Sequence, residues 1–248
     1  MKIVFIGAVK FSEHTLKKLI KMKADIVGVC TLKSSTFNSD HIDLTELCKT
    51  HNIPVNYCPD INSYKSINWI KSLNPDIIFC FGWSRLIKIK LLNLTKLGVI
   101  GYHPTKLPRN RGRHPIIWSI VFGLKETAST FFFMDQGADS GDILSQEIVT
   151  ITETDNSETL YNKLAKTAVN QIEKFLPSLQ SNSFNRIKQD DKKANYWRKR
   201  VAKDGRIDWR MSAESIHNLV KGLSYPYIGA HFDLKDKEIK VWKTKLVL

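Results

Sequence analysis

Short apolar runs alternate with amphipathic stretches through most of this chain. The apolar runs predict strands, because each is short, rich in β-branched or aromatic side chains and bounded by turn residues. They are residues 2–6, 26–30, 54–57, 75–81, 97–100, 128–134 and 143–149. The amphipathic stretches repeat apolar side chains at helical spacing and predict helices. They are residues 12–21, 43–51, 63–73 and 157–179, and Ser12 is the expected cap of the first.

Near-continuous apolar strands that alternate with helices are typical of a parallel sheet covered on both faces. The sequence therefore predicts an α/β fold with a doubly wound, mainly parallel, Rossmann-like sheet. In such sheets ligands bind beyond the carboxyl ends of the strands. The turn at residues 7–9 lacks Gly-x-Gly-x-x-Gly, and no Gly-Lys-Ser or Gly-Lys-Thr occurs. Neither a dinucleotide site nor that kind of phosphate loop is therefore expected.

The last quarter of the chain has a different pattern. Residues 181–203 are polar and charged and predict a linker. Beyond them we expect a strand at 206–209, a helix at 212–223 capped by Ser212, and strands at 230–234 and 239–243. The predicted division is therefore a catalytic domain at 1–180, a linker at 181–203 and a small β-rich subdomain at 204–248.

Residues 98–142 hold most of the side chains that could do chemistry. His103 follows the apolar run at 97–100, and Asp139 lies in a glycine-rich turn after the run at 128–134. Two neighbouring strands that end in a histidine and a carboxylate would bring the pair together at one edge of the sheet. An imidazole held by a carboxylate is suited to proton transfer near neutral pH.

Composition bounds the class of protein. With 248 residues and 42% hydrophobic content the chain can bury one ordinary core with a small appendage. No apolar run approaches the roughly 20 residues of a membrane span, and the first strand is too short for a signal peptide, so a cytoplasmic location is expected. The four cysteines lack Cys-x-x-Cys spacing, and His103 and His114 lack ligand partners at useful spacing. We expect neither a disulfide framework nor a metal site.

The formal net charge of +14 raises the possibility of a nucleic-acid partner. The excess is spread mostly as single lysines, however, which is typical of a solvated surface. Three arginines instead gather around Gly112: Arg109, Arg111 and Arg113. Guanidinium groups bind phosphate through paired hydrogen bonds, so this cluster favours a phosphate-bearing small ligand over nucleic acid.

Two motifs in this region carry a resemblance to a known family. His103-Pro-Thr-Lys-Leu-Pro108 and Gly137-Ala-Asp-Ser-Gly-Asp142 resemble the motifs of the formyltransferases that use 10-formyltetrahydrofolate. The family patterns are Asn-x-His-Pro-Ser-x-Leu-Pro and Gly-x-Asp-x-Gly-Asp, and further similarity covers residues 204–209 and 225–230. One departure stands out, because the family's asparagine falls on Gly101.

The resemblance implies roles for these residues. His103 would donate to the oxyanion of a tetrahedral intermediate, and Asp139 would orient it and accept a proton. The strand end at 81–86 would bind the folate, together with the glycine-rich turn. The implied folate residues are Phe81, Gly82, Trp83, Ser84, Arg85, Leu86, Asp135 and Gly137. Gly101 provides no amide, so either Asn110 supplies it, or a water does, or the protein is a poor catalyst; we expect Asn110.

The acceptor is also inferred from resemblance. Methionyl-tRNA formyltransferases have a longer C-terminal barrel and a basic loop after the second strand, whereas this C-terminal unit looks truncated. What remains resembles sugar N-formyltransferases, which act on nucleotide-linked 4-amino-4,6-dideoxy sugars for surface glycans such as lipopolysaccharide and are often homodimers. Arg109, Arg111 and Arg113 would meet the diphosphate, and Trp118 and Tyr225 would stack on base or sugar, although Trp118 fits a core position equally well. Methionyl-tRNA formylation, a non-catalytic folate- or nucleotide-binding protein and a formate-releasing hydrolase stay open as alternatives.

Overall fold

The fold is built on one seven-stranded sheet in the order β3-β2-β1-β4-β5-β7-β8. The computed structural model describes residues 1–36 and 38–247; Phe37, in the predicted loop at 32–41, and Leu248, in the predicted C-terminal unit, lie outside the described residues. The strands are β1 (Ile3–Ile6), β2 (Ile26–Thr31), β3 (Val55–Tyr57), β4 (Ile77–Cys80), β5 (Val99–His103), β7 (Glu126–Phe133) and β8 (Ile143–Thr150). The first five are parallel, and β7 and β8 are antiparallel to their neighbours. The predicted α/β class and its mainly parallel sheet are confirmed.

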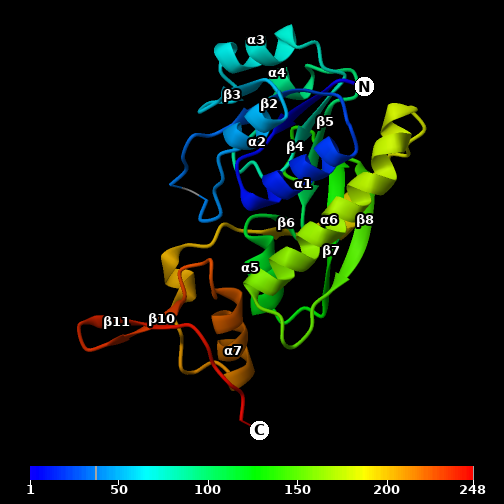
Figure 1. The fold of residues 1–248 in the computed structure, drawn as a ribbon. Coiled ribbons are helices and arrows are strands. Elements are labelled where there is room, and N and C mark those ends of the chain that lie inside the picture. Colours follow the sequence, from blue (N-terminus) through cyan, green and yellow to red (C-terminus); the bar gives the residue numbers. More distant parts are fainter. Residues whose placement is uncertain (37, 248) are drawn as a thin grey trace.

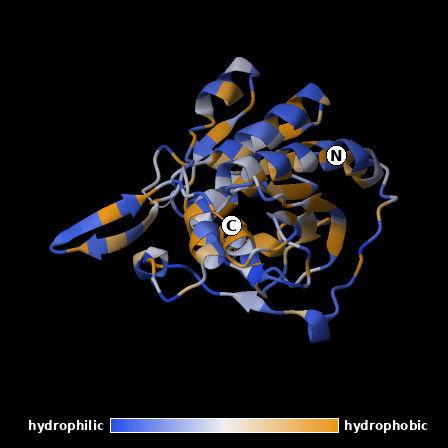
Figure 2. Ribbon diagram, turned by 90° about the horizontal axis from the view of Figure 1, so that it is seen from below, coloured by the Kyte–Doolittle hydropathy of each residue, from blue (hydrophilic) through white to orange (hydrophobic). Residues whose placement is uncertain are grey.

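Helices cover both faces of the sheet (Figure 1). The helices are α1 (Lys10–Lys21), α2 (Thr45–Thr50), α3 (Tyr64–Ser72), α4 (Ile89–Leu92), α5 (Pro115–Val121), α6 (Ser157–Gln180) and α7 (Ala213–Gly222). In β1, Ile3 and Phe5 pack with the cluster under α1 and α6, whereas Val4 and Ile6 pack with the cluster under α3 and α4. This alternation follows from the two-residue period of a strand. Apolar residues therefore line both faces of the sheet. In Figure 2 strands of the sheet carry the hydrophobic colour along much of their length.

Three local predictions differ from the structure. Helix α1 begins two residues before Ser12, so Val9 and not Ser12 is the N-cap residue; from the third helical position the Ser12 hydroxyl accepts from Val9 N at 3.2 Å and donates to Phe81 O at 2.6 Å. The predicted strand at 206–209 is reduced to a single bridge between Arg206 and His231. Strand β7 was placed correctly beside β5 but runs antiparallel to it, so the two strand ends do not meet at one edge.

The C-terminal part packs beside the sheet domain rather than extending the sheet. Helix α7 packs against α5 through a cluster that includes Ile117, Leu219 and Val220. Strands β10 (Ala230–Leu234) and β11 (Lys237–Val241) form a hairpin that projects from the body (Figure 1). None of the helices in the described part of the chain is both long and apolar enough to cross a membrane.

The segment predicted as a linker follows an ordered path across the molecule. It contains a 3-10 turn at Asp191–Lys193, strand β9 (Tyr196–Trp197) and a second 3-10 turn at Ala202–Gly205. Strand β9 pairs in parallel with β6 (Arg111–Gly112), which lies in the loop after the histidine strand. Residues 187–200, called the strap below, therefore lie directly behind the chemistry-bearing loop.

Candidate active site

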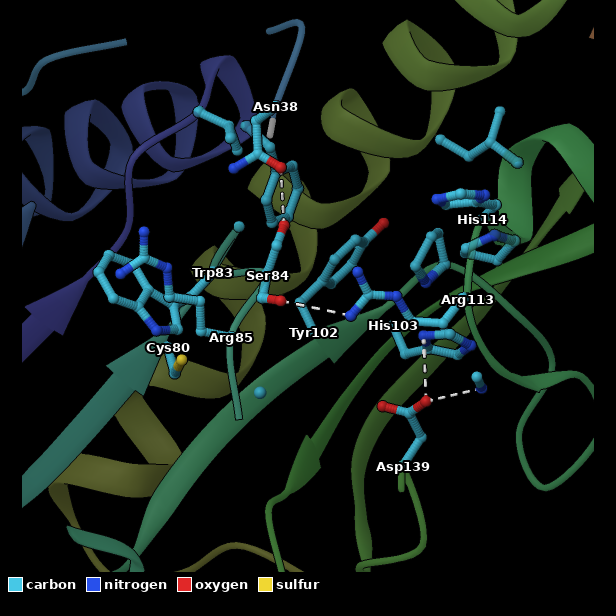
Figure 3. Close-up of a pocket in the computed structure, with 18 of the residues that line it drawn as sticks. Asn38, Cys80, Trp83, Ser84, Arg85, Tyr102, His103, Arg113, His114 and Asp139 are labelled. Atoms are coloured by element: carbon cyan, nitrogen blue, oxygen red, sulfur yellow. Dashed lines mark hydrogen bonds and ion pairs between the residues drawn. The ribbon is translucent and has the colours of Figure 1, made fainter. Parts of the chain in front are cut away.

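A cavity of about 540 Å³ lies beyond the carboxyl ends of the central strands, as expected for a doubly wound sheet. One wall is the loop after β4, residues 82–87, called the outer loop below. The opposite wall is the loop after β5, residues 104–115, called the inner loop below. His103 and Asp139 lie together at the foot of the inner loop (Figure 3). The predicted catalytic pair therefore lies in the same cavity as the outer loop and the inner loop, which supply different side chains to its lining.

The hydrogen bonds of His103 define its proton arrangement. Its Nε2 lies 2.9 Å from Asn110 O, and its Nδ1 lies 3.6 Å from Asp139 Oδ2. Because a carbonyl oxygen only accepts, the proton of a neutral ring is on Nε2. The lone pair then lies on Nδ1, on the Asp139 side. The side chain is only 6% exposed, so the ring is held in one orientation by its surroundings.

Asp139 reaches His103 by a turn rather than by a strand end. After β7, residues 135–142 fold back, and Asp135 Oδ1 accepts from Gly137 N at 2.9 Å and from Ser140 Oγ at 2.7 Å. Asp139 has φ of +55°, a left-handed conformation that aspartate tolerates better than most residues. Its Oδ2 also accepts from Gly112 N at 2.9 Å, which ties the turn to the inner loop. Asp135 therefore shapes the turn. It lies outside the cavity lining, which corrects the prediction that it binds the folate.

The outer loop supplies five of the predicted folate residues. Gly82, Trp83, Ser84, Arg85 and Leu86 all line the cavity, as does Gly137 across from them. Phe81 does not, because its ring is fully buried against Phe5 and Phe131, which corrects that prediction. The indole Nε1 of Trp83 is a buried donor with no hydrogen-bond partner among the described residues. A ligand acceptor on this side of the cavity would satisfy it.

The three predicted phosphate-binding arginines separate in the structure. Arg113 lines the cavity, and its Nη1 donates to Ser84 O at 3.3 Å (Figure 3). Arg111 is 2% exposed and is held by Gln189 Oε1, Asp191 and Tyr196, so it supports the inner loop from behind. Arg109 is exposed and points outside the cavity lining. Only Arg113 is placed to meet a ligand, which corrects the prediction for the other two.

Three further predicted residues also lie outside the cavity lining. The side chain of Asn110 is bonded to Asn195 at 3.0 Å, so only its backbone carbonyl serves His103. Trp118 is 9% exposed, donates through Nε1 to Arg198 O at 3.0 Å and stacks on Phe122. Tyr225 is 63% exposed and outside the lining, whereas Tyr227, two residues on, is part of it. These corrections remove Asn110 as the amide donor and Trp118 as a substrate platform.

The strap holds the catalytic residues, and sequence reasoning missed this role. The Nε2 of buried Gln189 donates to Asp139 O at 2.9 Å and to Gly141 O at 2.7 Å, while its Oε1 accepts from Arg111. Asn195 Oδ1 accepts from Asn110 N at 2.8 Å, and Trp197 O accepts from Arg113 N at 3.0 Å. Nothing in the local pattern marks these residues, because polar side chains in a charged segment also suit a linker.

Sequence reasoning also missed a third part of the cavity lining, contributed by helix α1, the loop after β2, helix α6 and the C-terminal unit. This part adjoins the outer loop, because Ser84 Oγ donates to Asn38 Oδ1 at 2.9 Å. The lining there includes Asn38, Ser39, Asp40, Phe11, Tyr161 and Tyr227. Tyr161 OH donates to Asp40 Oδ2 at 2.8 Å and accepts from Phe11 N at 2.8 Å. Burial, with Asp40 nearby, raises the pKa of Tyr227 to about 12, so both phenols stay neutral hydrogen-bonding groups.

His114 is a second histidine in the lining. Its backbone is left-handed, with φ of +55°, and its Nδ1 accepts from Arg200 N at 3.1 Å. Burial lowers the pKa of His114, and the charges of Arg113 and Arg200 lower it further. The ring is therefore neutral near pH 7 and carries its proton on Nε2. The described residues contain no group of three His, Cys, Asp or Glu side chains that could hold a metal ion.

The fold and the site together define a formyltransferase. The chain belongs to the formyl transferase family: residues 1–176 match the formyl transferase domain and residues 200–248 match the formyl transferase C-terminal domain. The predicted family and the predicted class of enzyme are confirmed.

Three relatives illustrate the range of the family. The bifunctional polymyxin resistance protein ArnA of Wigglesworthia glossinidia brevipalpis is 36% identical over 249 residues, 99% of this chain but 38% of ArnA. A methionyl-tRNA formyltransferase of Staphylococcus epidermidis is 32% identical over 99% of this chain and 80% of its own length. A solved N-formyltransferase from Helicobacter canadensis shares the fold, with a TM-score of 0.77 and 20% identity over 100% of this chain and 88% of that one.

Proposed function

We propose that this formyltransferase moves the formyl group of 10-formyltetrahydrofolate to the amino group of a nucleotide-linked sugar of the 4-amino-4,6-dideoxyhexose type. The product would enter a surface glycan such as lipopolysaccharide, and the predicted cytoplasmic location and homodimer belong to the same proposal. The division into 1–180, 181–203 and 204–248 also stays a proposal, now with the strap as a support of the site.

One observation carries the proposal: a single cavity brings together the outer loop, the pair His103 and Asp139, and a polar, aromatic region around Asp40. Asp40 in that region has a carboxylate, and Tyr161 and Tyr227 present neutral phenols. Carboxylate and phenol groups in a cavity suit sugar hydroxyls, and tyrosine rings stack on sugar or base faces. Asp139 and His103 line the same cavity, where a formyl donor and an amine would meet.

The similar protein from Helicobacter canadensis was solved with folinic acid and dTDP-3-aminofucose. A protein of this fold therefore binds both a reduced folate and a nucleotide sugar, which supports the same pair here. The outer loop fits a folate in one testable respect, because the unpartnered Trp83 N–H offers a buried donor to a heteroatom of the pterin. Arg113 lines the same cavity, where it can also meet an anionic group.

The geometry assigns each catalytic group a task. 10-Formyltetrahydrofolate supplies an activated formyl group. Asn110 O accepts the Nε2 proton and so orients the His103 ring, while Asp139 lies beside Nδ1 and accepts from Gly112 N. The Nδ1 lone pair of His103, with Asp139 beside it, takes the proton from the attacking amine and returns it to the leaving nitrogen.

The experiment is a panel of dTDP- and UDP-linked amino sugars with 10-formyltetrahydrofolate, in which conversion of the donor to tetrahydrofolate is followed by absorbance. We expect turnover with one 4-amino-4,6-dideoxy sugar and loss of about 100- to 10,000-fold in His103→Ala. Folinic acid should bind both proteins equally, which would show that the variant is folded. Turnover without any amine would support the hydrolase alternative and contradict the proposal.

Methionyl-tRNA is the second candidate acceptor. The net charge of +14 favours it, and so does the match to a methionyl-tRNA formyltransferase over 80% of that enzyme. Binding through phosphate contacts falls steeply with salt, whereas a dTDP-sugar presents only two phosphates. Formylation of charged initiator tRNA by this chain, with no reaction on any sugar, would replace the sugar proposal.

A further inference from the structure

The position that the resemblance assigns to an amide donor is blocked in this chain. Gly101 lies two residues before His103 in β5, so the two face the same side of the strand. A Cβ at Gly101 would lie 2.8 Å from Met134 Cγ and 3.2 Å from Phe132 Cε1. Met134 also lines the cavity. The Met134 side chain therefore fills the space that an asparagine at 101 would need.

Two other candidate donors do not serve the formyl oxygen. Asn110 lies outside the cavity lining, and its side-chain Oδ1 accepts from Asn195 Nδ2 at 3.0 Å. The N–H of His103 Nε2 is bonded to Asn110 O, and the other ring nitrogen faces Asp139. The negative charge that develops on the formyl oxygen still needs a donor, because such a donor is worth 100- to 1,000-fold in rate.

Arg113 is a charged donor that lines the cavity next to His103 (Figure 3). Its side chain extends from the inner loop across β5 to the outer loop, with the guanidinium between His103 and Ser84 (Figure 3). A guanidinium has five N–H donors, so it can bond to Ser84 O and to a second acceptor at once. Its position is set by the strap, since Arg113 N donates to Trp197 O at 3.0 Å.

We propose that Arg113 is the catalytic residue that stabilises the formyl oxygen in this chain, in place of an amide at position 101. The inference rests on 10-formyltetrahydrofolate as donor but not on the sugar. The amine nitrogen bonds to the formyl carbon, and the C=O electron pair moves onto the oxygen beside Arg113. The pair then returns, the bond from the formyl carbon to the folate nitrogen breaks, and that nitrogen takes the proton held by His103 and Asp139.

The first test compares Arg113→Met with wild type. Methionine has a similar reach but no N–H donor. Formyl transfer from 10-formyltetrahydrofolate to hydroxylamine is measured at saturating donor, because this small amine needs no sugar site. We expect kcat to fall about 100- to 1,000-fold. The affinity for folinic acid, measured by calorimetry, should change far less. Arg210→Met, at a side chain that is 90% exposed, is the matched control and should keep full activity.

The second test restores an amide. Met134→Ala makes room for an asparagine at position 101. In the Arg113→Met background, adding Gly101→Asn together with Met134→Ala should raise kcat at least tenfold. Gly101→Asn without the Met134 change should recover much less, because its Cβ meets Met134.

Three outcomes would overturn the proposal. Arg113→Met could weaken folinic acid binding with kcat unchanged, which would make Arg113 a donor-binding residue only. The restored asparagine could fail to raise kcat in a variant that binds folinic acid normally. Wild type could fail to accelerate formyl transfer to hydroxylamine at all, leaving no oxyanion to stabilise. Failure of the sugar panel alone would leave this test unaffected.

Discussion

The two walls of the cavity are held in different ways. The inner loop is fixed from behind by the strap, through hydrogen bonds from buried side chains such as Arg111 and Gln189. The outer loop has solvent on its far side: Leu86 is 70% exposed, and its carbonyl is held by one hydrogen bond from Asn62 at 2.8 Å. One wall is therefore braced from behind by buried side chains, and the other is held mainly by a few surface contacts.

This difference matches the tasks that the two walls would have. Catalytic groups must keep their geometry to within a fraction of an ångström, and a misplacement of 1 Å can cost about 100-fold in rate. A wall that admits a large, flexible ligand gains from being adjustable. Changes behind the inner loop should therefore lower kcat, and changes in the outer loop should mainly raise the KM for the donor.

Among residues that support the walls without touching the substrates, the largest effect is expected at Gln189. Gln189→Glu keeps the acceptor for Arg111 but replaces the Nε2 donor with an oxygen that faces the carbonyls of Asp139 and Gly141. We expect kcat to fall about 10- to 100-fold and the free energy of unfolding to fall by about 1–3 kcal/mol, because buried carbonyls lose their donor. Steady-state kinetics and chemical denaturation measure the two effects.

The matched control for Gln189→Glu is Gln180→Glu, at an exposed residue at the end of α6, which should change neither quantity. If the Gln189 variant raised only the KM for the donor, the distinction between the two walls would be wrong.

A smaller effect is expected in the outer loop. Leu86→Ala removes apolar surface that lines the cavity but packs little against the protein. Loss of about 1 kcal/mol of contact with the donor would raise its KM about fivefold, with kcat unchanged. Ile89→Ala, outside the cavity lining and 43% exposed, is the control. A lower kcat in Leu86→Ala would show that the outer loop also positions the reacting atoms.

The free energy of unfolding should depend on pH through His114, a residue of the inner loop. Burial lowers the pKa of His114, so the unfolded chain binds this proton more readily than the folded chain. Stability from this group is present above about pH 6.5 and is lost as pH falls towards the lower folded pKa. Asparagine tolerates the left-handed φ at position 114 and does not titrate. The stability of the His114→Asn protein should therefore fall less than that of wild type between pH 7 and 5. Equal losses in both proteins would exclude His114 as the cause.

The sequence predicted the sheet well because its strands are buried on both faces and read as apolar runs. It also identified His103, Asp139 and the outer loop, since these carry local motifs. It could not place Asp139 correctly, because the antiparallel direction of β7 depends on pairing across the sheet, and the turn at 135–142 makes the final approach. The strap was missed for a similar reason: Gln189 acquires its role only through contacts about 50 residues away in the chain.

Arg109 provides the smallest effect and the sharpest test of the arginine assignments. Charge alone grouped it with Arg111 and Arg113, but a loop residue can face either side, and Arg109 is exposed outside the lining. We expect Arg109→Gln to keep kcat and both KM values within about twofold, because exposed charges far from a ligand contribute little. The same assays as for Arg113→Met measure it. A raised KM for the nucleotide sugar alone would mean that the diphosphate extends over the outer surface of the inner loop, and the cavity would then bind only part of the substrate.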